Sequence, residues 1–301
     1  MKQIFIQLSV VIFLLSAVSF RCLGADKYTL EFNLEKGKTY KRNTVSDVNL
    51  TVNAMGQETK MNVKSELCNH YEVTGQNNDV YDIRMTYQKL KTSITGGPIT
   101  FSIDSDSPEN SSDQNSVKDI KSLLGIPIDI QLAKQGKVIS VKGIDQLTEK
   151  IDAMSNEQAK QMFNQQFSEK MIQTLVEQLS SYFPVKPVAV DESWDVTLNL
   201  DNGGFDIISK MNLSLKQVKD NVATIQLTGT LATPEGGAVL QIQGMDAKVS
   251  MTGEQSGTIL TDMKTGWILR SDVTQKSTQN IEIMGQSIQQ QMEMTTTITA
   301  E

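Results

Sequence analysis

The sequence predicts an α+β fold, a large antiparallel, twisted sheet or half-barrel with a central helical segment packed on it. Residues 28–103, and again the residues after Trp194, alternate between apolar and polar side chains, which is the period of a strand with one buried face. From Ile144 to Phe183 apolar residues instead recur every three or four positions, the spacing of one helix face. The expected organisation is a leader over 1–25 and a single exported β-rich domain over 26–301, divided into a first β region (26–142), a helical segment (143–183) and a second β region (190–301).

The first β region has the pattern of consecutive hairpins. Apolar and polar residues alternate over 48–54 and over 61–73, and Met55-Gly56-Gln57 supplies the turn between them, because glycine adopts the left-handed backbone of a tight hairpin. A second turn is expected over Gly75–Asp79, followed by a strand over 81–87. Such short connections can join only antiparallel strands.

Residues 104–116 are acidic and rich in serine, so we expect a mobile loop there. Its carboxylates could chelate Ca²⁺, although the stretch lacks the glycine and the last glutamate of a helix-loop-helix calcium site, and a solvated loop is the alternative. The four acids concerned are Asp104, Asp106, Glu109 and Asp113. Another hairpin is expected over 126–141.

The helical segment is expected to hold two helices. The first covers 144–154, and the second begins at Ser155–Gln158, a capping box in which a hydroxyl and an amide satisfy free backbone N–H groups. It continues to Phe183, where Pro184 and Pro187 stop it. Its apolar stripe must cover the sheet, either as core or as the wall of a cavity for an apolar ligand. The candidate ligand-facing residues are Met162, Phe163, Phe167, Met171 and Leu175.

The second β region consists of strands to the end of the chain. Turn signals occur at 202–204 and 234–237, and the last two strands bend at Met284-Gly285-Gln286. This second Met-Gly-Gln tip indicates either an internal duplication or convergent hairpin chemistry, since only the glycine is physically demanded. Several methionines on these strands face the expected helices, and methionine suits both a core and a ligand cavity. They are Met211, Met245, Met251, Met292 and Met294. Trp194 and Trp267 are expected to anchor the core.

The first 25 residues have the layout of a secretory signal peptide. Lys2 precedes an apolar run over 4–20, and Gly24-Ala25 offers a cleavage site. We therefore expect export to the periplasm or cell envelope, with association to the outer membrane as one option. Lipid attachment at Cys22 is disfavoured, because Arg21 occupies the position where the lipoprotein peptidase needs a small residue.

The charge of the chain narrows its partners. Lys and Arg number 28 against 35 Asp and Glu, a net charge of −7. A surface of this sign repels phosphate backbones, so nucleic acid is not an expected partner. After the leader no apolar run reaches the roughly 20 residues of a spanning helix, so no transmembrane segment is expected.

Candidate metal ligands lie on one strand. Residues spaced by two project from the same face of a strand, and carboxylate, thiolate and imidazole there could share an ion. The four are Glu66, Cys68, His70 and Glu72. The alternative is a solvated polar face, because the apolar residues of this strand occupy the opposite face and the chain has one histidine. No Walker A, G-x-S-x-G, H-E-x-x-H or C-x-x-C motif is present, so neither a catalytic site nor a cofactor is predicted.

Four segments together resemble an uncharacterised family of exported proteins from Bacteroidota-type envelopes, known only as a domain of unknown function. They are Lys36–Tyr40, Gly136–Val138, Phe183–Trp194 and Asp262–Trp267. Relatives usually carry Gly before Asp in the V-x-V-G-D-x-W part of the third segment, where this chain reads Val190-Asp191-Glu192, so the turn is expected to differ. The resemblance implies a fold and a compartment and carries no active site.

The sequence therefore favours a non-enzymatic envelope protein. One hypothesis is a module that binds an apolar or amphiphilic small molecule between the sheet and the helices. A second is a structural or partner-binding module that contacts another envelope protein. A third is a hydrolase with dispersed carboxylates, which would need a deep polar cleft where acids converge.

Overall fold

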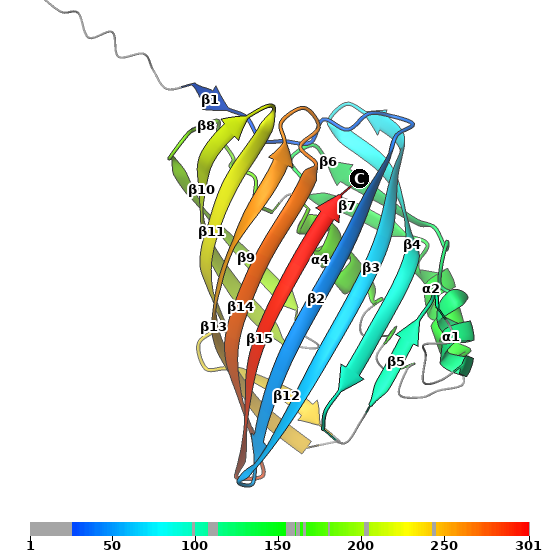
Figure 1. Ribbon diagram of the computed structural model, residues 1–301, viewed down its shortest axis with the longest axis vertical. Helices are drawn as coiled ribbons and strands as arrows, with labels where there is room; N and C mark the ends of the chain where they lie inside the picture. Colours follow the sequence, from blue (N-terminus) through cyan, green and yellow to red (C-terminus); the bar gives the residue numbers. More distant parts are fainter. Residues whose placement is uncertain are drawn as a thin grey trace, which may run out of the picture.

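The computed structural model describes residues 26–97, 100–107, 114–154, 160, 163–164, 167–179, 181–201, 205–242 and 245–300. The predicted leader, with Cys22, and the predicted capping box at Ser155–Gln158 lie outside this part of the chain. Figure 1 shows one large, strongly curved sheet whose long strands extend well past a small group of helices.

The first β region contributes β1 (Lys27–Tyr28), β2 (Thr39–Ala54), β3 (Gln57–Asn77), β4 (Val80–Thr95), β5 (Phe101–Asp104), β6 (Ile128–Ala133) and β7 (Val138–Lys142). The described helices are α1 (Gln114–Lys121), α2 (Ile144–Asp152) and α4 (Glu169–Glu177). The second β region contributes β8 (Val188–Ala189), β9 (Ser193–Asp201), β10 (Asp206–Lys219), β11 (Val222–Ala232), β12 (Ala238–Ile242), β13 (Met245–Asp262), β14 (Ile268–Ile283) and β15 (Gln286–Ala300).

The two β regions form a single sheet, because the last strand pairs with the first long one. Among the described residues the sheet has 13 strands, and its main path runs β7-β6-β4-β3-β2-β15-β14-β13-β11-β10-β9. Strands β5 and β12 pair with β4 and β13 beside this path, and β1 pairs separately with β8. The sheet is not closed, since β7 and β9 are its edges. The predicted fold class, a mostly antiparallel α+β protein, is confirmed.

Two hairpin tips use the same turn, as predicted. Met55-Gly56 joins β2 to β3 with φ angles of 50° and 78°, and Met284-Gly285 joins β14 to β15 with 51° and 78°. Positive φ at both central residues gives the turn whose twist matches that of paired strands. The next predicted turn is shorter than Gly75–Asp79, because β3 continues to Asn77. Gly75 instead lies at a register shift, where a side chain would meet Asp82 at 2.7 Å.

The prediction of a mobile loop over 104–116 is wrong at both ends of that stretch, because β5 includes Asp104 and α1 begins at Gln114. Asp104 is 5% exposed, its Oδ2 lies 2.9 Å from Lys91 Nζ, and its Oδ1 accepts the backbone N–H groups of Asp106 and Ser107. These partners offset the cost of burying the carboxylate. The last residues of the stretch begin α1, a helix that the sequence analysis did not predict.

The helical segment is more divided than predicted. Helix α2 follows the predicted first helix, but residues 167 and 168 are not helical, and α4 starts only after them. Ser168 caps α4 by accepting the N–H of Met171 at 3.3 Å, a polar start signal within the apolar stripe. No helix among the described residues combines the length and apolar character needed to cross a membrane.

The turn before β9 has Asp191 where the V-x-V-G-D-x-W pattern has glycine. Asp191 has a φ of 66°, a left-handed backbone that glycine favours and aspartate tolerates. The N–H of Asp191 donates to the Leu215 carbonyl, and that of Glu192 donates to the Ala189 carbonyl. Asp191 therefore adopts a backbone that glycine favours, and the expectation that this turn differs from that of the relatives stays a prediction.

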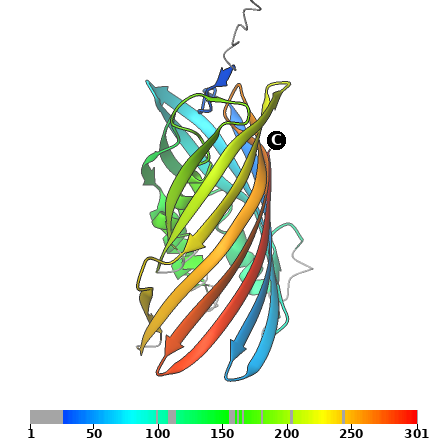
Figure 2. The same cartoon turned by 90° about the vertical axis from the view of Figure 1, so that its left-hand side faces the viewer.

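The core lies on the concave side of the sheet, where Figures 1 and 2 place the helices. Aromatic residues dominate its upper part. Trp267 is 4% exposed and lies 4.9 Å from the Tyr40 ring and 5.4 Å from the Tyr71 ring. Trp194 is half-buried, and its indole donates to the Tyr182 carbonyl at 3.0 Å. Trp267 is the core anchor that the sequence predicted.

Candidate ligand-binding site

The predicted ligand-facing residues pack into the core where their side chains are described. Phe163 and Phe167 are 3% and 2% exposed and lie 5.7 Å apart, and the Phe167 ring meets the Tyr87 ring edge-on at 4.8 Å. Leu175 packs against the same cluster, and Met171 is half-buried. Met162 lies outside the described residues. These side chains fill the space between the helices and β4.

Below the helices the described residues cover less of the concave face (Figure 1). On β3 the buried residues Tyr71 and Asn69 mark the inner face, and alternation along the strand puts further apolar residues on that face. Six of them, on three neighbouring strands, lie in two rows: Val63, Val48 and Met294 are opposite one another, as are Met61, Leu50 and Met292. We call these six the inner apolar band.

The inner apolar band is half-buried throughout. In the described part of the chain none of its members belongs to or packs against one of the three core clusters. A curved sheet face with contiguous, partly exposed apolar side chains is typical of a surface that receives another molecule. The sequence pattern identified Met292 and Met294, but their neighbours follow only from the strand register.

Beside the inner apolar band the concave face becomes polar and small. Gln275 and Ser277 on β14 lie opposite Met294 and Met292. On β11, a Cβ at Gly229 would lie 2.5 Å from the Lys210 carbonyl oxygen and 3.2 Å from Gln255 Nε2. The missing side chain lets the Gln255 amide reach Ser209, to which it donates at 2.8 Å. An amphiphilic molecule would therefore find apolar and hydrogen-bonding surface side by side.

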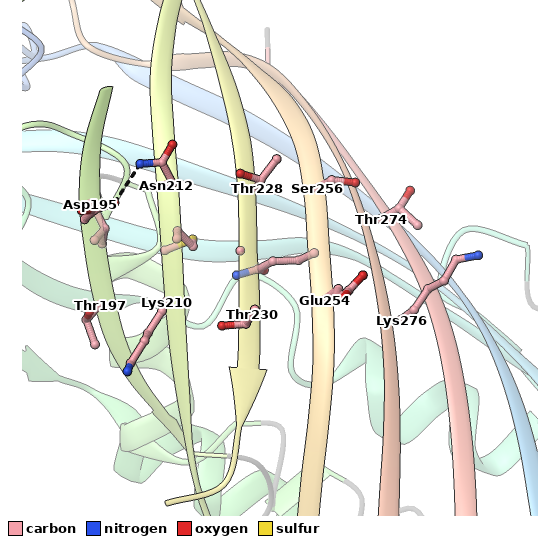
Figure 3. Close-up of a pocket in the computed structure, with 14 residues that line it drawn as sticks. Asp195, Thr197, Lys210, Asn212, Thr228, Thr230, Glu254, Ser256, Thr274 and Lys276 are labelled. Atoms are coloured by element: carbon pink, nitrogen blue, oxygen red, sulfur yellow. Dashed lines mark hydrogen bonds between the residues drawn. The ribbon is translucent and has the colours of Figure 1, made fainter. Parts of the chain in front are cut away.

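The opposite face of the sheet carries an open groove of about 900 Å³ across β9 to β14, shown in Figure 3. Four residues on neighbouring strands are directly paired and form a row across this groove. In order they are Lys210, Thr230, Glu254 and Lys276. Lys210 and Lys276 stand at opposite ends in Figure 3. Lys276 pairs with Glu293 at 3.0 Å, whereas Lys210 and Glu254 form no ion pair among the described residues. We call this the outer groove.

The chemistry of the outer groove is polar and non-aromatic. Its lining is mostly threonine, serine, amide and charged side chains, and Asn212 donates to Asp195 Oδ1 at 2.8 Å. The two acids, Asp195 and Glu254, lie on strands separated by two others, which at about 4.8 Å per strand sets them roughly 14 Å apart. Paired catalytic carboxylates of glycosidases stand about 5–9.5 Å apart, so this groove does not bring acids together for that chemistry.

The four residues proposed as metal ligands lie on the outer face of β3. Glu66 pairs with Lys89 at 3.1 Å, and Cys68 is half-buried. The pKa of His70 is lowered, first by burial and then by the charge of Lys41. Among the described residues no group of three or more His, Cys, Asp or Glu is placed to hold a metal ion. Of the candidate calcium ligands, Glu109 and Asp113 lie outside the described residues.

Comparison with known proteins identifies a family but assigns no activity to it. The model of a family described as "Family of unknown function (DUF6263)" matches residues 78–268. No curated protein matches the chain. Solved structures with partial likeness are an outer membrane channel of Pseudomonas putida F1 (5% identity, 90% of this chain and 97% of that chain, TM-score 0.25) and OccK5 of Pseudomonas aeruginosa (6% identity, 88% and 99%, TM-score 0.29). OpdQ of Pseudomonas aeruginosa is similar at the same level (8% identity, 87% and 99%, TM-score 0.27).

Proposed function

Since the chain belongs to DUF6263, a family of unknown function, we propose its role from its own geometry. The proposed function is that of an exported, non-enzymatic envelope protein that binds an apolar or amphiphilic ligand on the concave face of its sheet. The observation that carries the proposal is the inner apolar band, which the helices leave partly exposed. Export rests on the leader over 1–25, and the non-enzymatic role on the lack of a catalytic motif.

The size of the inner apolar band supports a ligand of acyl or similar character. Full burial of a Val, Leu or Met side chain contributes about 1.5–3 kcal/mol. Completing the burial of six half-buried side chains would therefore contribute on the order of 5 kcal/mol before the cost of association. Methionines at three of the six positions, Met61, Met292 and Met294, adapt to ligands of different shape. In this proposal the ligand lies below the helices and away from Phe163 and Phe167, which fill the core.

A matched pair of variants on β15 tests the proposal. The probe is N-phenyl-1-naphthylamine, a neutral fluorescent amphiphile, titrated into the purified protein. Met292→Glu puts a charge in the inner apolar band and is expected to weaken binding at least tenfold. Glu293→Gln, the next residue on the outer face, is expected to leave binding unchanged. Equal affinity of the two folded variants, or no binding to the unmodified protein, would contradict the proposal, and native mass spectrometry would identify a co-purifying ligand.

A partner-binding role is the second candidate, supported by the outer groove. Lys210 and Glu254 project there without an ion pair among the described residues, so both charges are available to an extended segment of another protein. Pull-down from envelope fractions with the unmodified protein and with Lys210→Glu tests this role. The expected result is one captured protein that is lost on charge reversal. If Lys210→Glu captures the same protein as the unmodified chain does, the outer groove is not the contact surface.

A further inference from the structure

Arg42 is a charged residue inside the core. It lies on β2 opposite Asn69 on β3 and Ala300 on β15, on the same face as the core residues, and is 7% exposed. Its Nε and Nη1 are buried and have no hydrogen-bond partner in the described part of the chain. A guanidinium cannot lose its proton in a protein, so burial cannot neutralise it. An unpaired buried ion is strongly destabilising, and an acceptor with negative charge offsets that cost most directly.

The described residues supply no such acceptor. The sole buried acid among them is Asp104, and its Oδ2 lies 2.9 Å from Lys91 Nζ. Asn69, the cross-strand neighbour of Arg42, uses its amide to donate to the sulfur of Met85 at 3.7 Å. Arg42 is therefore not explained as half of an internal ion pair within this part of the chain.

The groups around Arg42 are donors as well. The Trp267 indole N–H is buried without a hydrogen-bond partner among the described residues, and its ring lies 5.4 Å from that of Tyr71, whose buried hydroxyl is within hydrogen-bonding reach of Arg42 and Asn69. Burial raises the pKa of Tyr71 and of Tyr182, and the nearby charge of Arg42 acts against that rise in both; hydrogen bonding with Arg42 and Asn69 also acts against it in Tyr71. Arginine and tryptophan can only donate hydrogen bonds, and the Tyr71 hydroxyl is a neutral acceptor, so what this cluster lacks is a negatively charged acceptor.

We propose that Arg42, Tyr71 and Trp267 form an interior anion site that binds a carboxylate. A single guanidinium balances a single negative charge, so a carboxylate is neutralised, whereas a second charge on phosphate would stay unbalanced among aromatic rings. The surrounding rings of Tyr40 and Trp267, 4.9 Å apart, exclude water and strengthen a charge-assisted hydrogen bond. The site is independent of the inner apolar band and stands even if that band binds nothing.

The carboxylate could belong to a free small acid or to the head of an amphiphile. Along β2 the inner face continues from Arg42 through Thr44 and Ser46 to Val48, the first residue of the inner apolar band. Six residues of strand span about 20 Å, so only a ligand of that length could reach both. Acetate and decanoate separate the two sources, and decanol controls for binding by the chain alone.

The experiment uses the whole exported protein with Trp194→Phe, so that Trp267 is the one remaining tryptophan. Acetate, decanoate, decanol and inorganic phosphate are titrated, with Trp267 emission and the melting temperature as readouts. We expect decanoate or acetate to change both readouts, and phosphate to bind at least tenfold more weakly. Arg42→Met, which keeps the volume and removes the charge, is expected to abolish the response, and Tyr71→Phe to weaken it three- to tenfold while the fold is retained.

Each outcome decides the proposal. Response to acetate assigns the site to free acids, and response to decanoate alone assigns it to an amphiphile. If Arg42→Met fails to fold, two other variants decide the proposal. Arg42→Lys keeps the charge and changes the donor geometry, and both it and Tyr71→Phe must lower the affinity for the carboxylate. Equal response of Arg42→Met and the parent protein overturns the site, as does a decanol response equal to that of decanoate or no response to any carboxylate. Binding of the neutral probe to the inner apolar band would survive that failure and keep the two proposals distinct.

Discussion

Truncation of Phe167 is the sharpest test of whether the helical stripe is core. The ring is 2% exposed, meets the Tyr87 ring edge-on at 4.8 Å and stacks near Phe163 at 5.7 Å. Phe167→Ala removes the whole ring from a site that the sheet and helices hold on both sides. Buried Phe→Ala changes cost about 3–5 kcal/mol, and two aromatic neighbours favour the upper half of that range.

The expected loss in the free energy of unfolding is therefore about 4 kcal/mol. For a chain of this size 1 kcal/mol corresponds to about 2–4 °C, so the melting temperature should fall by roughly 8–16 °C. Urea unfolding followed by circular dichroism measures the change, and the m-value should stay constant if the native state keeps its shape. Met171→Ala is the matched control in the same segment, where a half-buried side chain predicts a loss of about 1–2 kcal/mol.

A loss below about 1 kcal/mol for Phe167→Ala, at constant m-value, would refute the assignment of Phe167 to the core. If the same variant then failed to bind the neutral amphiphile, the residue would be a ligand contact, and the cavity would lie between sheet and helices. If Phe167→Ala loses much stability but its folded molecules bind the neutral amphiphile as before, the result supports the ligand site below the helices. The two readouts together separate the alternatives that the apolar stripe left open.

Three further predictions follow from single positions. Met55→Asn should raise the free energy of unfolding by about 0.5–1 kcal/mol, because asparagine tolerates the left-handed φ of 50° better; an unchanged urea midpoint would count against strain at that tip. Gly229→Ala should lower stability by about 1–3 kcal/mol, since a Cβ there collides with backbone and displaces the Gln255 amide; a neutral effect would mean that the strand can shift. His70 should titrate below its usual value of about 6.5 as the single imidazole signal in NMR spectra, and Lys41→Met should raise its pKa. Because the unfolded chain then binds the proton more readily, stability should rise with pH between the folded pKa and about 6.5, and His70→Gln should remove that slope.

Features set by a few neighbouring residues could be predicted from the sequence. The Met55-Gly56 and Met284-Gly285 tips are examples, because a glycine between two alternating runs fixes both the turn and the register of the strands. The strand faces followed from the period of two, and Trp267, expected as a core anchor, is buried. Local pattern therefore determined the class of the fold and most of its hairpins.

Features set by distant contacts were misjudged. Gly75 was read as a turn, although its role is to clear space for Asp82 on the next strand. Asp104 was read as part of a solvated loop, because its pairing with Lys91 depends on β5 joining β4. The inner apolar band depends on β15 pairing with β2, and these strands are separated by most of the chain. Neither composition nor spacing carries information about such pairs.

Arg42 shows why the anion site escaped the sequence pattern. It stands in the run Lys41-Arg42-Asn43-Thr44, which is polar at every position, so alternation could not say which side chains face the core. Only the register with Asn69 and Ala300 places Arg42 inside. A charge at a core position is a conflict between local sequence and global fold, and proteins keep such conflicts chiefly where function requires them. That conflict, more than the methionine-rich stripe, makes Arg42 the first residue to change in a search for the ligand.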